Sequence, residues 1–101
     1  MPPRRRRPRD LVDDWPESPL EDVPGEIVRQ IALALSAAIN KRSLRTVARL
    51  TGVDHTTIAD ILRGTSWPDA LTIARLEIGL GAHLWPTSFV AGHLGPSSAH
   101  R

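Results

Sequence analysis

The chain has 101 residues, with 13 Lys and Arg, 11 Asp and Glu and no cysteine, and this length predicts one small domain with tails. The absence of cysteine excludes a disulfide scaffold and a thiolate zinc site. The apolar stretches are short and interrupted by charge, so we predict no membrane span, and the basic N-terminus lacks the apolar segment of a secretory signal.

The net charge of +2 conceals four segments of different charge. Residues 1–10 contain five Arg and one Asp, and residues 11–28 contain six acidic residues and no basic one. Residues 29–64 contain six basic and two acidic residues, whereas residues 65–101 contain two of each. The positive charge is therefore concentrated at the start and in the middle of the chain.

Residues 1–24 are predicted to be a largely disordered arm, basic at first and then acidic. The run Arg4–Arg7 stands among three prolines in residues 1–10, and a segment of this composition cannot bury a core. The spacing of Ser18-Pro19-Leu20-Glu21 is that of a capping box and favours at most a single helical turn. We expect residues 11–24 to lay an aromatic side chain over the domain.

Helical periodicity predicts a domain of five short helices over residues 25–91. The first spans about residues 25–40, because Ile27, Ile31, Leu35 and Ile39 recur every four residues before Asn40. The others are expected at residues 44–51, 55–63, 69–80 and, interrupted by Pro86, 84–90. No alternating pattern indicates a strand, so the fold class is all-α, and residues 92–101 are expected to be a disordered, polar C-terminal tail.

The second and fourth predicted helices are each expected to turn their apolar side chains toward the core. These side chains are Leu44, Val47, Ala48 and Leu50 in the second helix, and Leu71, Ile73, Ala74, Leu76, Ile78 and Leu80 in the fourth.

The stretch 44–64 contains the residue types that a helix-turn-helix requires. Ala48 is small where a second helix would cross it, and Gly52 supplies the positive φ at which the chain reverses. Asp54 is an N-cap for the second helix of the motif. The side chains expected to fix the angle between the helices are Val47, Val53, Ile58 and Ile61.

This stretch resembles the helix-turn-helix of the phage repressor and Cro-like regulators, the XRE family. The resemblance continues through Arg63-Gly64, Pro68 and the segment TIARLEIGLG, and covers about residues 26–85. The pairing of Trp67-Pro68 with Leu84-Trp85-Pro86 is also similar to the small phage Ner-type regulators. The chain departs from the family at Leu62, where many members have Glu, and at Thr51, where an aliphatic residue is commoner.

The resemblance implies a lambda-repressor-like fold and a transcriptional regulator, in particular a repressor, that binds double-stranded DNA sequence-specifically. The helix over residues 55–63 would enter the major groove. The residues that would contact bases are His55, Thr56, Thr57, Ala59 and Asp60. The residues that would contact the DNA backbone are Lys41, Arg42, Ser43, Arg45, Arg49, Arg63, Thr65 and Ser66.

Two interpretations of Arg4, Arg5, Arg6 and Arg7 stay open. This run could follow the minor groove or the phosphates as an arm, or it could be a solubilising tail that folds back on the acidic stretch. The three tryptophans, Trp15, Trp67 and Trp85, are expected to pack in the core or at an interface.

No enzyme, cofactor or metal site is predicted. His55 and Asp60 belong to no catalytic arrangement, and His83, His93 and His100 are too widely spaced for a metal site on a helix. No glycine-rich phosphate loop is present.

Protein partners beyond DNA stay open. The apolar residues Leu84, Trp85, Phe89 and Val90 could form a homodimer contact or cap the core. One alternative function is the antitoxin of a toxin–antitoxin pair that also represses its operon, and another is a protein-interaction adaptor that does not bind DNA. We expect a cytoplasmic protein that contacts no membrane, located at a bacterial nucleoid and encoded by a bacterium, phage or plasmid.

Overall fold

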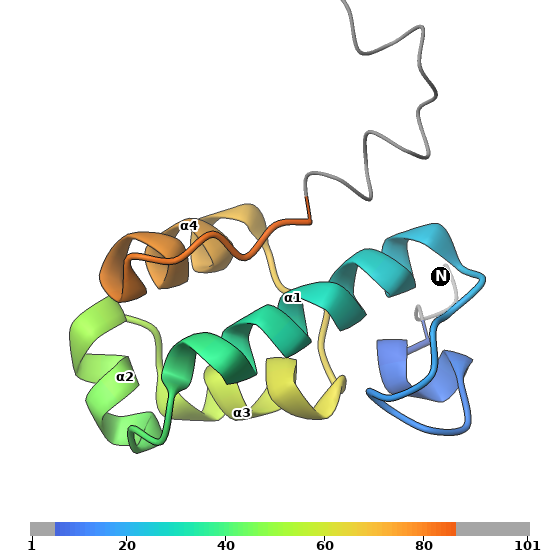
Figure 1. Cartoon of the computed structure of the whole chain (residues 1–101), viewed down its shortest axis with the longest axis horizontal. Coiled ribbons are helices and arrows are strands. Elements are labelled where there is room, and N and C mark those ends of the chain that lie inside the picture. Colours follow the sequence, from blue (N-terminus) through green and yellow to red (C-terminus); the bar gives the residue numbers. More distant parts are fainter. Residues whose placement is uncertain (1–5, 87–101) are drawn as a thin grey trace, which may run out of the picture.

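The computed structural model describes residues 6–86, and this part of the chain is all-helical (Figure 1). A short 3₁₀-helix, η1 (Pro8–Leu11), precedes four α-helices. These are α1 (Val23–Ile39), α2 (Leu44–Thr51), α3 (His55–Arg63) and α4 (Ala70–Leu80). The described residues contain no strand, so the predicted all-α class is confirmed.

The fifth helix, predicted at residues 84–90, is absent from the part of this range that the structure describes. Residues 84–86 are not helical, and residues 87–91 and the predicted tail 92–101 lie outside the described residues. Within residues 6–86, no helix is both long and apolar enough to cross a membrane.

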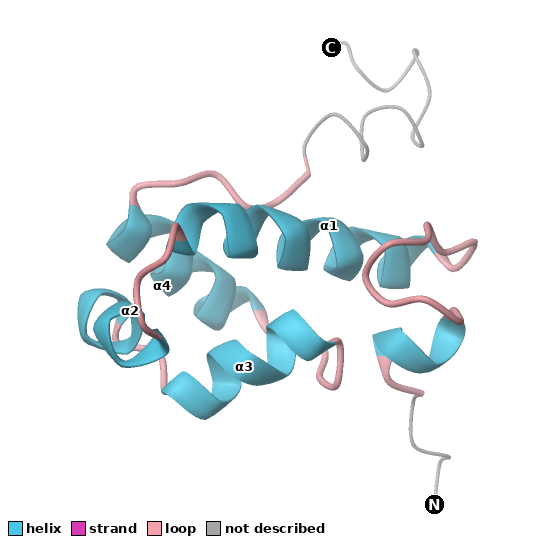
Figure 2. Ribbon diagram, turned by 60° about the horizontal axis from the view of Figure 1, so that its bottom comes forward, coloured by secondary structure: helices cyan, strands magenta, loops and turns pink. Residues whose placement is uncertain are grey.

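The helices pack around α1, which runs along the length of the domain (Figures 1 and 2). Helix α3 packs on α1, and α2 packs on both α3 and α4. The core side chains that are fully buried come from all four helices and the segment after α4; they are Ile31, Leu35, Val47, Ile58, Ile61, Leu76 and Leu84. Each such side chain stabilises the fold by about 1.5–3 kcal/mol through its removal from water.

The core confirms the residues predicted to fix the helix-turn-helix, since Val47, Val53, Ile58 and Ile61 are all buried. Four predicted inward positions are wrong: Leu50, Leu71 and Ile78 have exposed fractions of 48%, 58% and 82%, and Ala74 is also exposed.

Helical geometry explains these four errors. In α2 the buried pair is Val47 and Thr51, four residues apart, and this pair turns Leu50 away from the core. In α4 the buried pair is Ile73 and Leu76, so the other three residues lie on the other faces of the helix.

Helix α1 begins earlier than predicted, at Val23, because Asp22 is its N-cap. The Asp22 carboxylate accepts a hydrogen bond from the Gly25 N–H at 2.9 Å. The capping-box spacing at residues 18–21 produces no helix, since residues 18–22 are irregular. At the other end of α1, Asn40 has a left-handed φ of 49° and ends the helix as predicted.

The expectation of a largely disordered arm over residues 1–24 differs from what the structure shows for residues 6–22, which we call the N-terminal strap. The strap contains η1 and buries Pro8 and Leu20 against the domain. Apolar burial and a few strong polar anchors order this segment despite its charge. Residues 1–5 lie outside the described part of the chain.

A buried ion pair on α1 is one of these anchors. The carboxylate of Glu26 accepts hydrogen bonds from Arg29 at 2.7 and 2.8 Å and from the Leu20 N–H at 2.8 Å. Arg29 also donates to the carbonyl oxygen of Pro16 at 3.0 Å. The two side chains are only 7% and 11% exposed, and the Arg29 guanidinium lowers the pKa of Glu26 to about 2. This pair therefore fixes the end of the strap to α1.

Candidate nucleic-acid interface

Helix α2 is built from local signals at both ends. The Ser43 hydroxyl accepts the Thr46 N–H at 3.1 Å and caps its N-terminus. Gly52, at a φ of 75°, ends the helix and donates its N–H to the Ala48 carbonyl at 2.8 Å. A left-handed residue is needed here because the chain must turn directly into α3.

Thr51 takes a structural role at the position where it departs from the family pattern. Its hydroxyl donates to the Val47 carbonyl at 2.8 Å and accepts the Val53 N–H at 3.2 Å. The turn between α2 and α3 is thus closed by a buried side chain. Helix α4 approaches closely at this point, since a Cβ on Gly79 would lie 2.6 Å from the Cα of Thr51.

Helix α3 is capped at both ends by residues outside its exposed face. The Asp54 carboxylate accepts the Thr56 N–H at 2.9 Å, and this backbone hydrogen bond lowers the pKa of Asp54. Gly64 ends the helix at a φ of 72°, and its N–H points back to the last turn.

Among the predicted base-contacting residues, Thr56, Ala59 and Asp60 lie on the side of α3 away from the buried Ile58 and Ile61, whereas Thr57 lies one turn before Ile61, beside the core face. His55 and Thr56 are exposed at the N-terminus of the helix, whereas Thr57, Ala59 and Asp60 are half-buried along it. His55 and Thr56 are therefore the most accessible of these five residues.

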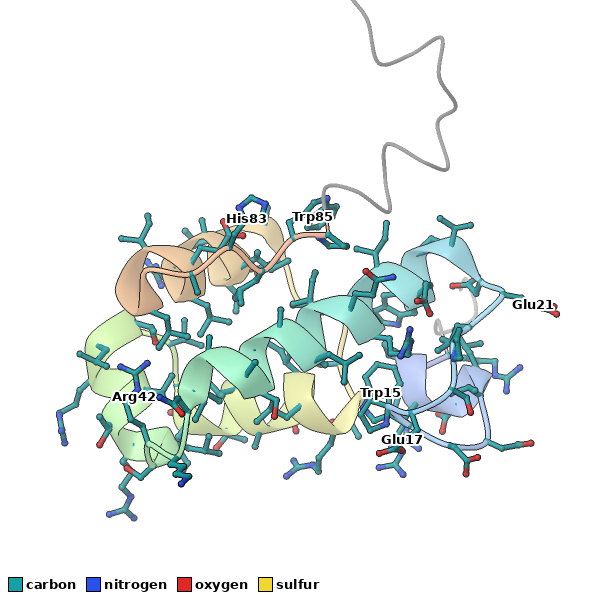
Figure 3. All side chains as sticks on the ribbon, viewed as in Figure 1. Trp15, Glu17, Glu21, Arg42, His83 and Trp85 are labelled. Atoms are coloured by element: carbon teal, nitrogen blue, oxygen red, sulfur yellow. The ribbon has the colours of Figure 1, made fainter. Side chains whose placement is uncertain are left out.

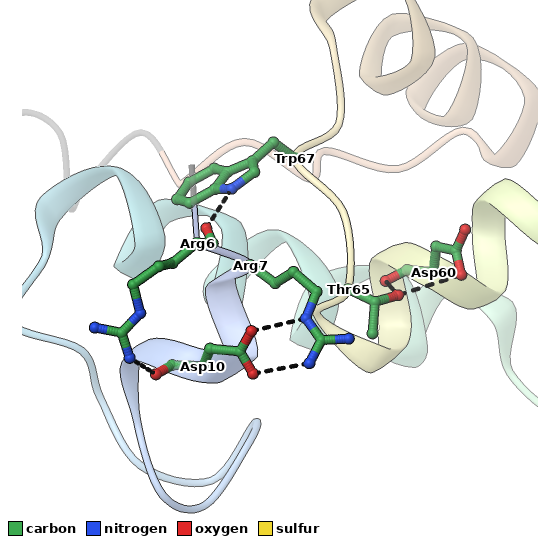
Figure 4. A network of polar contacts seen from close by, with 6 residues as sticks. All are labelled: Arg6, Arg7, Asp10, Asp60, Thr65 and Trp67. Atoms are coloured by element: carbon green, nitrogen blue, oxygen red, sulfur yellow. Dashed lines mark hydrogen bonds and ion pairs between the residues drawn. The ribbon is translucent and has the colours of Figure 1, made fainter. Parts of the chain in front are cut away.

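Asp60 is held within the chain. Its carboxylate accepts a hydrogen bond from the Arg63 guanidinium at 2.7 Å. It also accepts one from the Thr65 hydroxyl at 3.2 Å (Figure 4). The Thr65 N–H also donates to the Asp60 carbonyl at 3.0 Å. The negative charge of Asp60 is therefore balanced by Arg63, which was predicted as a phosphate contact.

The predicted backbone-contacting residues divide into accessible and engaged groups. Lys41, Ser43, Arg45 and Arg49 are exposed at and around α2. Arg42 is exposed, but its guanidinium donates to the carbonyl oxygens of Ala38 and Ile39 at 2.8 and 3.1 Å and caps the end of α1 (Figure 3).

Ser66, also predicted as a backbone contact, points inward. Its hydroxyl oxygen is buried and has no hydrogen-bond partner within residues 6–86. Ser66 is half-buried, and its hydroxyl is not accessible to a phosphate in this arrangement.

Trp15 connects the strap to the end of α3, which the sequence indicated only as an aromatic laid over the domain. Its Nε1–H donates to the Leu62 carbonyl at 3.0 Å. The ring lies against Gly64, where a Cβ would collide with it, and Figure 3 shows Trp15 beside the end of α3. Leu62, a second departure from the family, thus has its carbonyl capped by an indole.

Two further contacts at the same place were not predicted. The Arg9 N–H donates to the Gly64 carbonyl at 2.9 Å, and the Trp67 Nε1–H donates to the Arg6 carbonyl at 2.8 Å (Figure 4). Because these bonds join residues far apart in sequence through backbone atoms, no pattern in the sequence indicates them.

Residues 37–84 match a family model described as helix-turn-helix. These residues are a helix-turn-helix domain of the XRE family. The matched range contains all of α2, α3 and α4 but only the end of α1, and it excludes the strap. No curated protein and no solved structure matches the chain.

The XRE family consists of DNA-binding regulators and is not an enzyme family. The exposed outer side of α3 is thus part of a domain that binds double-stranded DNA. Among residues 6–86, no three His, Asp or Glu side chains are grouped so that they could hold a metal ion.

Proposed function

We propose that this XRE-family protein is a sequence-specific transcriptional regulator that inserts α3 into the major groove and represses by occupying promoter DNA. The observation that carries the proposal is the outer side of α3, where short polar side chains are presented by a helix whose other side is locked in the core. A rigid helix of this kind can bring side chains to base edges in a fixed register.

The base contacts are assigned to the accessible end of α3. His55 can donate or accept at a base edge, and the hydroxyls of Thr56 and Thr57 can bond a base or a phosphate. Ala59 offers a methyl group that fits against the methyl of thymine. The Asp60 carboxylate orients the Arg63 guanidinium. It accepts a hydrogen bond from a cytosine amino group only where that group displaces the Arg63 guanidinium as its donor.

The phosphate contacts are assigned to the residues around α2. Arg45, Arg49 and Lys41 are exposed and positively charged, and they supply the electrostatic part of binding. Ser43 lies at the N-terminus of α2, where backbone N–H groups and the helix dipole attract a phosphate. These contacts fix the register in which α3 lies on the duplex.

Selection of bound sequences from a pool of random duplexes tests the proposal. We expect a defined motif to be enriched, and the affinity for that motif to fall steeply with salt, with a log–log slope of about −0.9 for each phosphate contacted. The variant His55→Ala is expected to relax one position of the motif, whereas Arg49→Gln should weaken all sequences alike and reduce the slope by about 1. No enriched motif and no dependence on salt would show that the proposal is wrong.

The same experiment addresses the finer parts of the proposal. An inverted repeat in the enriched motif supports a homodimer, and a single half-site with a monomer in sedimentation contradicts it. Repression is tested with a reporter gene whose promoter overlaps the enriched motif. Expression that rises with the amount of protein would contradict repression.

A further inference from the structure

The strap is attached to the end of α3 by three hydrogen bonds that converge on one place. Trp15 donates to the Leu62 carbonyl, the Arg9 N–H donates to the Gly64 carbonyl, and Trp67 donates to the Arg6 carbonyl. Every one of these acceptors is a backbone carbonyl. None of these three bonds involves a charged side chain of the strap.

Three arginines of the strap are held beside the end of α3 by this attachment. The side chains of Arg6, Arg7 and Arg9 are exposed. In Figure 4, Arg7 points from the strap toward the end of α3, where Thr65 and Asp60 lie. Together with Arg63, these residues are four positively charged side chains near one end of the candidate interface, where Asp10, Asp60 and, beside Trp15, Glu17 are negatively charged (Figure 3).

Asp10 orders two of these arginines. Its carboxylate forms a two-bond pair with the Arg7 guanidinium at 2.7 and 3.0 Å, and its carbonyl accepts from Arg6 at 2.6 Å. The Arg7–Asp10 pair is exposed, with side chains 54% and 38% accessible. Because exposed ion pairs contribute little free energy, a phosphate can replace the carboxylate at small cost, and guanidinium groups bind phosphate with the same two-bond geometry.

We propose that Arg6, Arg7 and Arg9 form a second phosphate-binding surface, which contacts the DNA backbone next to the segment read by α3. This inference rests on the proposed function, because it places the duplex against α3. The surface lies outside the matched range of residues 37–84 and depends on the docking of the strap. It ends after Arg9, since the exposed residues Asp13, Asp14 and Glu17 follow along the strap.

The test measures salt dependence and backbone protection on two duplexes, the selected motif and a mixed-sequence duplex. In the triple variant Arg6→Gln, Arg7→Gln, Arg9→Gln we expect the log–log slope to become shallower by up to about 3, at about 0.9 for each lost contact. Hydroxyl-radical cleavage should show lost protection on one flank of the motif, with the protection at its centre retained. Circular dichroism establishes whether the triple variant folds. If it does not fold, the same measurements are made on the single variant Arg9→Gln.

The matched control for charge is Arg75→Gln on α4. Arg75 is exposed and lies on the helix behind α2 and α3 in Figure 2, so we expect its loss to leave the slope and the protection unchanged. If Arg9→Gln and Arg75→Gln had the same effect, net charge alone would explain binding, and the second surface would be disproved.

The control for docking is Trp67→Phe, which removes the indole donor and keeps all charges. We expect the flank to lose protection while the centre keeps it. Unchanged protection would overturn the claim that the Trp67–Arg6 bond positions the arginines. A wild-type protein with a steep slope and a triple variant with the same slope would overturn this inference alone, whereas a flat slope in the wild type would overturn the proposed function.

Discussion

The helix-turn-helix, residues 44–64, and the N-terminal strap are both ordered, but they are ordered by different means. Bonds within the helix-turn-helix join near neighbours, such as Ser43 to Thr46 and Asp54 to Thr56. The strap is attached by bonds that span 47 and 61 positions, from Trp15 to Leu62 and from Trp67 to Arg6. The helix-turn-helix is therefore specified by local interactions, whereas the conformation of the strap depends on the folded domain to which it binds.

Truncation of a core side chain is expected to destabilise the helix-turn-helix and the strap together. Ile58 is completely buried between the helices, so Ile58→Ala is expected to destabilise the fold by about 2–5 kcal/mol. Urea unfolding followed by circular dichroism measures the loss. The matched control is Leu71→Ala on the exposed side of α4, which should cost far less. Equal losses in the two variants would contradict the core described here.

Acid should loosen the strap before the helix-turn-helix, because the ion pair of Glu26 and Arg29 holds the strap. The folded state lowers the pKa of Glu26 from 4.5 to about 2. Its contribution is therefore complete above pH 4.5 and is lost as the pH falls toward 2, and it amounts to roughly 3 kcal/mol at 1.4 kcal/mol per pKa unit.

Urea unfolding at neutral pH and in this acid range measures the effect of Glu26. In Glu26→Gln the acid-dependent part of the stability should be largely absent, whereas the exposed control Glu21→Gln should retain it. An unchanged pH profile in Glu26→Gln would mean that another group causes the acid sensitivity.

A pair of glycine substitutions separates two contributions to the free energy of unfolding, that of the left-handed helix end and that of the packing of the strap. Gly64 and Gly81 both have positive φ, at 72° and 62°, but only Gly64 faces the Trp15 ring. Gly81→Ala is expected to cost about 1–2 kcal/mol from backbone conformation alone. Gly64→Ala should cost more, because the methyl group also displaces Trp15. Equal costs from thermal unfolding would show that the strap contributes nothing at this point.

The smallest effect is expected from the indole donor of Trp15. Trp15→Phe keeps a ring against Gly64 and removes the hydrogen bond to the Leu62 carbonyl, at a cost of about 0.5–1.5 kcal/mol. Hydrogen exchange should report the change in the strap while the amides of α3 stay protected. Faster exchange throughout α3 would show that the strap and α3 unfold together.

Much of the fold could be predicted because its signals are local. The helices of the motif end where Gly52 and Gly64 stand, and the buried positions Val47, Ile58 and Ile61 follow from helical period. The predicted inward orientation of Leu50 and Ile78 is wrong because an apolar residue in a short helix can face solvent. Periodicity over eight to eleven residues fixes the buried face of a helix only to within one position.

The candidate site was predictable in its location but not in its internal bonds. The sequence places His55 and Thr56 on the exposed end of the helix, and the structure has them there. It does not reveal that Arg42 caps α1 or that Arg63 is paired with Asp60, since a charged side chain can choose among several partners of similar energy. The strap escaped prediction because its composition is that of a disordered segment and its anchors are backbone carbonyls far away in sequence.

The caps of α3 have a consequence for how this protein can change over evolution. Asp54 and Gly64 hold the ends of the helix, and Ile58 and Ile61 hold its inner side, so the exposed side chains of His55 and Thr56 contribute little to the core. Substitutions at these two exposed positions are expected to carry little penalty in folding. Under the proposed function, substitution of these outer residues would change the DNA target while the framework of the domain is retained.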